Sequence, residues 1–154
     1  MITKQEFVNM SNNRLIQIEI LGLDTIDRQL QQLMSVNKTR ALEEIGQYVT
    51  SEVQQRFARS EDHEGRAWQS LRYRVGKPLV DTGVLKSSIT HRILNGNSVE
   101  VGTNVTYAAI HNYGGRAGRG KKVKIPQREF MGISDNNEIE ILEIANKYFN
   151  VQRR

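Results

Sequence analysis

The residues best suited to acid–base or metal chemistry in this chain are its three histidines, His63, His91 and His111. No two of them stand at a metal-ligand spacing such as HxxxH or HExxH, and the chain has no cysteine that could complete a site. A serine hydrolase would need a nucleophile motif such as GxSxG, and the sequence contains none. We therefore expect no catalytic residue, no metal and no cofactor. A hydrolase that uses His111 is kept as a distant alternative.

Glycines and basic residues crowd together in "GGRAGRGKK", Gly114–Lys122. This pattern does not fit a phosphate-binding loop of the GxxxxGK[ST] type, because no Ser or Thr follows the lysine and no helix is predicted to start there. The cations can instead bind phosphate groups or an acidic protein surface. A solvated loop without a partner is the other interpretation. The residues that we expect to bind a partner are Arg116, Arg119, Lys121, Lys122 and Lys124.

The basic residues are concentrated in the middle of the chain. Residues 55–130 carry 14 basic and 6 acidic side chains, whereas the net charge of the whole chain is +5. If five cations bound five phosphates, the affinity for DNA would depend on salt concentration with a logarithmic slope of about −4.5. No recognition helix or stacking platform is evident. The alternative function is therefore DNA binding that is independent of the base sequence.

The composition is that of one ordinary globular domain. The chain has 154 residues, of which 38% are hydrophobic and 25% charged. The start, "MITKQEFVNM", lacks the apolar core of a signal peptide, and no stretch approaches the roughly 18 apolar residues of a membrane span. We expect a soluble protein that is made in a cytoplasm and has no membrane partner.

The strongest helix prediction covers residues 38–59. Apolar residues recur at intervals of three and four along this segment, which is the period of a helix with one buried face. Gly46 lies beside that stripe and indicates a close crossing with another element. A shorter helix is predicted over 24–34, with a break at Ser35–Asn37. The stripe consists of Leu42, Ile45, Val49, Val53 and Phe57, with Ala41 and Tyr48 at its margins.

Two segments predict β-structure. Residues 14–22 alternate between isoleucine and polar residues, which is the period of a half-buried strand. Residues 89–103 predict a hairpin with a three-residue loop, Asn95–Asn97, in which Asn97 would be left-handed. This loop pairs Arg92 with Glu100 on one face. On the other face it pairs Ile93 with Val99, His91 with Val101 and Ile89 with Thr103.

The segment between the long helix and the hairpin reads as an extended connection over residues 60–83. We expect Trp68, Leu71 and Leu79 to anchor it. Residues 82–89 predict a short helical turn that Asp81 or Thr82 would cap.

The rest of the chain predicts a helical turn, a loop, an extended piece and a final helix. The turn, Tyr107–Gly115, ends at two glycines, and the side chain of His111 is expected to form a local hydrogen bond. Residues 114–124 are too rich in glycine and charge to hold a structure of their own. Residues 123–134 are extended, and Pro126 keeps them out of the middle of a sheet. The final helix, 136–149, would bury a face formed by Ile139, Leu142, Ala145 or Asn146, and Phe149.

These elements predict a single α+β domain over residues 1–154. Its antiparallel sheet contains a β-hairpin and is packed by one long helix and a C-terminal helix. The domain carries an N-terminal extension at 1–13, a flexible basic loop at 114–124 and a tail at 150–154.

Several segments together resemble the tailed-phage virion morphogenesis family, also called tail completion proteins. They follow in the family's order: "RF" (Arg56–Phe57), "EGRAWQSL" (Glu64–Leu71), "LVDTGVLKSSI" (Leu79–Ile89), "VGTNVTYAAIHNYGG" (Val101–Gly115) and "IPQREFMGIS" (Ile125–Ser134). The similarity spans about residues 42–149. "DHEG" departs from the family, which often has a proline before Asp-Gly at this point, and "PQREFMG" departs where a second proline or arginine-proline is common.

The resemblance implies a structural virion protein rather than an enzyme. It implies a protein that completes or terminates the tail and takes part in head–tail joining at the neck, as a homo-oligomer, with a hexameric ring preferred. The implied partners are the tail tube, connector proteins and the DNA in the channel. Such a protein would be assembled in the cytoplasm of the bacterial host. The residues expected to act as structural anchors are Phe57, Trp68, Leu71, Gly83, Leu85, Tyr107, His111, Gly114, Gly115, Pro126 and Phe130.

Overall fold

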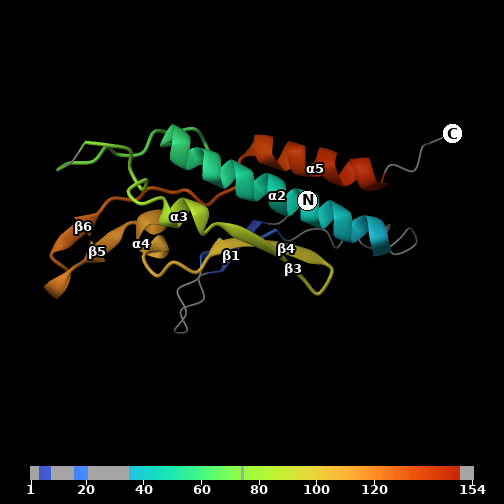
Figure 1. Cartoon of the computed structure of the whole chain (residues 1–154), viewed down its shortest axis with the longest axis horizontal. Helices are drawn as coiled ribbons and strands as arrows, with labels where there is room; N and C mark the ends of the chain where they lie inside the picture. The colour runs from blue at the N-terminus through green and yellow to red at the C-terminus, as the bar shows by residue number, and fades with distance from the viewer. Residues whose placement is uncertain (1–3, 8–15, 21–34, 74, 150–154) are drawn as a thin grey trace.

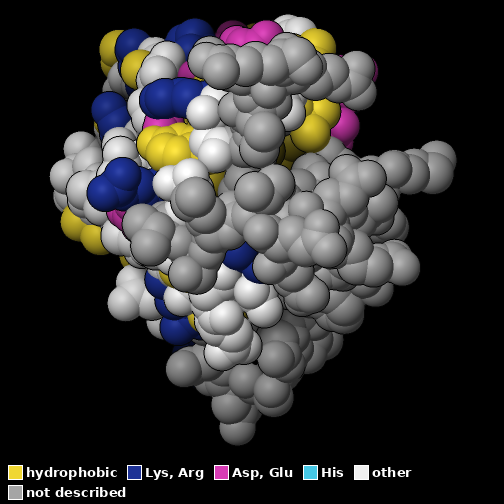
Figure 2. All heavy atoms as spheres, turned by 90° about the vertical axis from the view of Figure 1, so that its right-hand side faces the viewer, with side chains coloured by type: hydrophobic (Ala, Val, Ile, Leu, Met, Phe, Trp, Pro, Cys, Tyr) yellow, Lys and Arg dark blue, Asp and Glu magenta, His cyan; other side chains and the backbone are white. Residues whose placement is uncertain are grey.

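A long helix, α2 (Ser35–Arg59), lies across a four-stranded antiparallel sheet in the computed structural model of the protein (Figure 1). The structure describes residues 4–7, 16–20, 35–73 and 75–149, whose side chains are coloured by type in Figure 2. The C-terminal helix, α5 (Asp135–Phe149), packs against α2 on the side away from the sheet. The α+β fold predicted from the sequence is confirmed, and both predicted helices are present. The sequence places both of them on the sheet, whereas in the structure α2 lies against the sheet and α5 packs on α2.

The sheet has the strand order β1-β2-β4-β3, and every neighbouring pair is antiparallel. The strand predicted from alternating isoleucines is β2, which pairs with β4 so that Ile18 lies opposite Val101. β1 falls within the expected N-terminal extension, where the sequence predicts no strand. The strands are β1 (Lys4–Phe7), β2 (Ile16–Ile20), β3 (Thr90–Leu94) and β4 (Ser98–Thr103).

α2 buries the apolar stripe that its periodicity predicts. Every member of the stripe, from Leu42 to Phe57, is at most 3% exposed. These side chains form one core with Val99 and Val101 of β4. The predicted break at Ser35–Asn37 is wrong, because α2 begins at Ser35 and continues without interruption. The shorter helix predicted over 24–34 lies outside the described residues.

Gly46 is the point at which α2 comes closest to the sheet. A Cβ atom added there would lie 2.5 Å from Cδ2 of His91 and 2.8 Å from Cγ2 of Val99. Both distances are shorter than any normal contact of a Cβ atom, so that only glycine fits without a shift of the helix or the strands. The predicted close crossing is confirmed.

The β3–β4 hairpin has the predicted register. His91 lies opposite Val101 on the face toward α2, and Ile93 lies opposite Val99. On the other face, Nε of Arg92 donates to Oε2 of Glu100 at 2.7 Å. β3 begins at Thr90, so that the pair expected at Ile89 precedes the strand.

The conformation of the hairpin loop differs from the prediction. The left-handed residues are Asn95, with φ 51°, and Gly96, with φ 68°, instead of Asn97. The amide of Asn97 donates to the carbonyl of Leu94 at 3.0 Å. Positive φ at an Asn-Gly pair is typical of the turn whose twist matches that of paired strands. Asn97 is thus the additional residue after a two-residue turn.

Trp68 anchors the connection between α2 and the next helix, α3 (Val84–Ser87). Its ring meets that of Phe57 edge to face, with centroids 5.6 Å apart, and its Nε1 donates to the carbonyl of Glu129 at 3.0 Å. Phe130 packs on Phe57 from another side, at 5.2 Å. All three rings belong to the hydrophobic core.

α3 (Val84–Ser87) is the predicted short helical turn, although its start differs from the expectation. The N-cap residue is Gly83, with φ 77°, and neither Asp81 nor Thr82 occupies that position. The hydroxyl of Thr82 lies 3.5 Å from the amide nitrogen of Val84. Glycine is favoured because the left-handed conformation costs it little.

A second hairpin follows α4 (Ala108–Tyr113), the helical turn that the sequence predicts. It consists of β5 (Gly115–Ala117), the short 3₁₀ turn η1 (Arg119–Lys121) and β6 (Val123–Ile125). The prediction that this segment holds no structure of its own is wrong, whereas its flexibility stays a prediction. Pro126 follows β6 directly and, as expected, lies outside the strands.

α5 buries Ala145, one of the two residues predicted for that position, but its buried face otherwise differs from the predicted one. Ile141 and Ala145, each 4% exposed, pack in the core, whereas Ile139 is 54% exposed and Leu142 39%. The sequence prediction failed because apolar residues occur on both sides of this helix.

Among the described residues, no helix is long and apolar enough to span a membrane.

The start of α5 is fixed by a reciprocal cap. The hydroxyl of Ser134 accepts from the amide of Asn137 at 3.3 Å, and Oδ1 of Asn137 accepts from the amide of Ser134 at 3.1 Å. This is a capping box with Asn in place of the usual Glu or Gln. At the far end of α5, Glu44 of α2 binds Nζ of Lys147 at 2.9 Å and the hydroxyl of Tyr148.

Candidate functional site

The second hairpin carries the five predicted partner-binding cations, and we call residues 115–125 the basic hairpin. Arg116 of β5 lies directly opposite Lys124 of β6, so that two like charges share one face of the ribbon. Directly opposed like charges on neighbouring strands destabilise a ribbon. All five cations are exposed, and within the described part of the chain none of them pairs with a carboxylate.

The tip of the basic hairpin turns through left-handed residues. Gly118 has φ 77°, Gly120 φ 70° and Lys121 φ 53°. Lys121 donates its amide to the carbonyl of Gly118 at 3.0 Å, which closes the turn. Glycine makes this sharp tip possible, and the same residues made the segment look unstructured in the sequence.

The base of the basic hairpin is held by α4. Gly114, with φ 72°, packs so closely on the backbone of Gln127 that an added Cβ would lie 3.0 Å from its nitrogen. The amide of Arg128 donates to the carbonyl of His111 at 2.8 Å. The buried Oδ1 of Asn112 accepts from the amides of Phe130 and Met131 at 3.0 and 2.9 Å. α4 therefore fixes the segment that follows the basic hairpin.

A buried arginine extends this support into the core. Arg56 of α2 is 2% exposed. Its guanidinium donates to the carbonyls of Phe130 and Gly132 at 2.9 and 2.8 Å and to Oδ1 of Asn137 at 2.9 Å. Burial lowers the pKa of this group below its ordinary value. Arg56 thus ties α2 to the segment between the basic hairpin and α5.

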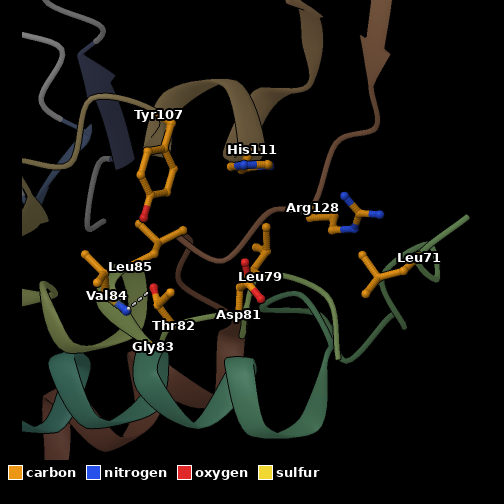
Figure 3. A pocket seen from close by; sticks show the side chains of 10 residues that line it. All are labelled: Leu71, Leu79, Asp81, Thr82, Gly83, Val84, Leu85, Tyr107, His111 and Arg128. Carbon is orange, nitrogen blue, oxygen red and sulfur yellow. Dashed lines mark hydrogen bonds between the residues drawn. The ribbon is translucent and has the colours of Figure 1, made fainter. Parts of the chain in front are cut away.

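A hollow of about 390 Å³ opens beside the base of the basic hairpin (Figure 3). Leucines and Val84 form much of its wall, His111 of α4 and its N-cap residue Tyr107 contribute rings, and Arg128 lies at its edge. The guanidinium of Arg128 is held by the carbonyl of Gln69, at 2.9 Å from Nε. Asp81 and Thr82 also line the hollow.

The geometry of His111 does not form a catalytic triad. Burial, and then the charge of Arg128, lower the pKa of His111, so that its imidazole is neutral at neutral pH. Its Nδ1 is buried without a hydrogen-bond partner, so that no carboxylate orients the ring. The local hydrogen bond expected for this side chain is therefore not formed at Nδ1. The ring contacts Tyr107 edge to face, at a centroid distance of 5.9 Å.

The other two histidines, His91 and His63, are held by hydrogen bonds or close packing within the fold. His91 lies between β3 and α2, where its Nε2 is 2.9 Å from Oε1 of Glu43 and its Nδ1 is 3.3 Å from the hydroxyl of Thr50. His63 packs closely against Gly132, where an added Cβ would lie 2.4 Å from Nδ1 of the imidazole. Within the described ranges, no group of His, Asp and Glu side chains could hold a metal ion.

The predicted anchor residues separate into core and surface positions. Phe57, Trp68, Leu85 and Phe130 are buried in the core. Leu71 is half-buried in the wall of the hollow, Pro126 is half-buried, and Tyr107 is 44% exposed. The glycines at 83, 114 and 115 all have positive φ. The sequence did not indicate the buried polar residues that support the hairpin, namely Arg56, Asn112, Arg128 and Asn137.

Comparisons with known proteins agree on one relationship. Residues 21–150 match the phage virion morphogenesis family. The chain is 43% identical over 138 residues to "Mu-like prophage FluMu G protein 2" of Haemophilus influenzae. The aligned region covers 88% of this chain and 96% of that protein. No solved structure matches the chain.

Proposed function

Because the chain belongs to the phage virion morphogenesis family, we propose that it completes the phage tail and takes part in joining the tail to the head. A role in virion morphogenesis follows from the family, and the place of action at the tail end and neck is our proposal. The observation that carries the proposal is the basic hairpin. It presents five exposed cations on a defined ribbon at one end of the molecule (Figure 1).

We propose that the protein acts by contact and without catalysis. The hollow beside α4 has a neutral imidazole without an orienting carboxylate, and its lining contains no serine or cysteine nucleophile. The family's role in building the particle also supports a structural protein.

In this proposal the protein works as a closed ring, with six copies as the preferred number, inside the neck of the virion. Subunits of a ring meet through two different surfaces, each of which faces its complement on the next copy. The neighbours of the ring would be the tail tube and connector proteins, and assembly would take place in the cytoplasm of the bacterial host. A ring would also gather its basic hairpins around one axis.

The second candidate function is DNA binding that is independent of base sequence. The pairing of Arg116 with Lys124 favours it, because a phosphate placed between them would relieve their repulsion. Purified protein would then bind duplex DNA with a salt slope of about −4.5 if all five cations took part. An absence of binding at low salt would exclude this candidate.

Charge reversal of the hairpin tests the proposed function. We expect the variant Arg119→Glu/Lys121→Glu/Lys122→Glu to block head–tail joining, measured as free heads and tails by electron microscopy. The melting temperature should stay nearly unchanged, because all three side chains are exposed. Arg72→Glu, which reverses an exposed charge elsewhere, is the matched control and should join normally. Normal particles from the triple variant would contradict the proposal.

A further inference from the structure

α5 has a second apolar side that its own chain leaves exposed. We define the outer face of α5 as Ile139, Glu140, Leu142 and Glu143, all of which are exposed. Ile139 and Leu142 stand three residues apart and are therefore neighbours on the helix surface. The opposite side of the helix, with Ile141 and Ala145, already packs in the core. A helix that is apolar on two sides has surface left for a second contact.

The basic hairpin is complementary in charge to the outer face of α5 and, like it, exposes apolar surface. Arg116 and Lys124 occupy one face of the ribbon, and the cross-strand pair Ala117 and Val123 occupies the other. Val123 is 54% exposed, so that this second face offers an apolar side chain, directly after Lys121 and Lys122 of the tip in the chain. The outer face of α5 offers two apolar side chains among carboxylates. The two surfaces thus match in apolar character and are opposite in charge.

These two surfaces cannot meet within one chain. β5 and β6 lie at the lower left of Figure 1 and α5 at the upper right, on the far side of α2. Their complementarity can therefore be satisfied only in contact with another molecule.

We propose that the basic hairpin of one copy docks on the outer face of α5 of the next copy. This inference rests on the proposed function, because it names the surfaces through which the ring would form. The contact is head to tail: each copy uses its hairpin toward one neighbour and its α5 toward the other. Such heterologous contacts close into a ring when the rotation between copies allows it.

The composition of the contact predicts its strength. A hairpin of this size laid on one helix face covers much less than the roughly 2,000 Å² that permanent interfaces bury. The ion pairs at its rim are screened by salt, with a Debye length of about 8 Å at physiological ionic strength. Single contacts are therefore weak in dilute solution. They become strong when a tail end holds several copies at high effective concentration.

A charge exchange between the two surfaces tests the inference. The hairpin variant is Lys121→Glu/Lys122→Glu, the helix variant is Glu140→Lys/Glu143→Lys, and the exchanged variant combines all four changes in one chain. Each is supplied to a phage that lacks its own copy of the gene, and the yield of infectious particles is measured. Arg72→Glu and Glu64→Lys are the controls, because both side chains are exposed and lie outside the two surfaces.

We expect each two-residue variant to lower the yield at least tenfold and the exchanged variant to restore most of it, while the controls stay at the wild-type level. All variants should keep the wild-type melting temperature, which separates docking from folding. Full yield from either two-residue variant overturns the inference, and so does a lack of restoration in the exchanged chain. Loss from the hairpin variant alone would assign the hairpin to DNA or to another virion protein instead.

A second measurement separates this inference from the proposed function. Purified particles are treated with a carbodiimide, which joins a lysine to a carboxylate in direct contact, and the linked peptides are identified by mass spectrometry. Links from Lys121 or Lys122 to Glu140 or Glu143 are expected. If the protein is present in the neck without these links, the docking inference fails and the proposed function stands. If the protein is absent from particles, the proposed function itself fails.

Discussion

The substitution Gly46→Ala tests how closely α2 crosses the β3–β4 hairpin. The new methyl carbon would lie 2.5 Å from the ring of His91 and 2.8 Å from Cγ2 of Val99. The ring cannot swing away freely, because His91 contacts Glu43 and Thr50 through its two nitrogens. The helix or the strands must therefore shift.

Two opposing effects determine the stability of this variant. Alanine is better than glycine in a helix by about 1 kcal/mol. Forcing a methyl group into a filled core costs about 1–3 kcal/mol, and the clash here involves two side chains. We expect the clash to dominate, with a net loss of about 1–2 kcal/mol. For a domain of this size that loss lowers the melting temperature by about 2–8 °C.

Thermal unfolding followed by circular dichroism measures this effect. Ser51→Ala is the matched control, because it adds alanine to an exposed position of the same helix and should be neutral or slightly stabilising. An equal gain in melting temperature for both variants would refute the close crossing. In the double variant Gly46→Ala/His91→Ala, the loss should be smaller than the sum of the two single losses, since one clash is removed.

Three further predictions concern the support of the basic hairpin and the hollow beside it. Arg56→Met leaves the carbonyls of Phe130 and Gly132 without their buried donor, whereas Oδ1 of Asn137 keeps the amide of Ser134 as a donor. At about 1–3 kcal/mol for each of the two unsatisfied carbonyls, urea unfolding should show a loss of about 2 kcal/mol or more, and a loss below about 1 kcal/mol would contradict the network. Asn112→Leu removes the acceptor for the amides of Phe130 and Met131, so that hydrogen exchange at these two amides should become faster. Protection equal to that of the wild type would contradict the role of Asn112 as their acceptor. The pKa of His111 is lower in the folded than in the unfolded protein. The contribution of this histidine to the free energy of unfolding is therefore complete above the unfolded pKa of about 6.5 and is lost as the pH falls below that value. His111→Gln should flatten the dependence of the free energy of unfolding on pH between about pH 7 and pH 5, and an unchanged dependence would contradict the assignment.

The parts of the fold that local pattern dictates could be predicted from the sequence. The stripe from Leu42 to Phe57 follows the helical period over several turns, and one face of it is buried. The register of the β3–β4 hairpin follows because a single loop length places Arg92 opposite Glu100 on one face and Ile93 opposite Val99 on the other. In both cases the preference of each residue agrees with the tertiary structure.

Features that depend on distant partners could not be predicted in this way. Arg56 finds its acceptors on backbone carbonyls at Phe130 and Gly132, and carbonyls leave no signal in the residue types. The buried side of α5 could not be chosen, because Ile139 and Ile141 both belong to apolar sides and only the position of α2 decides between them. The basic hairpin was missed since its short strands depend on support from α4 and on glycines at the tip.

The most direct test of the central claim is a reconstruction of the complete virion at a resolution that traces side chains. The proposed function predicts density for this chain at the head-proximal end of the tail, repeated around the tail axis. The docking inference predicts further that each basic hairpin in that density lies against α5 of the adjacent copy. A neck without density for this chain would contradict the proposed role in tail completion and head–tail joining.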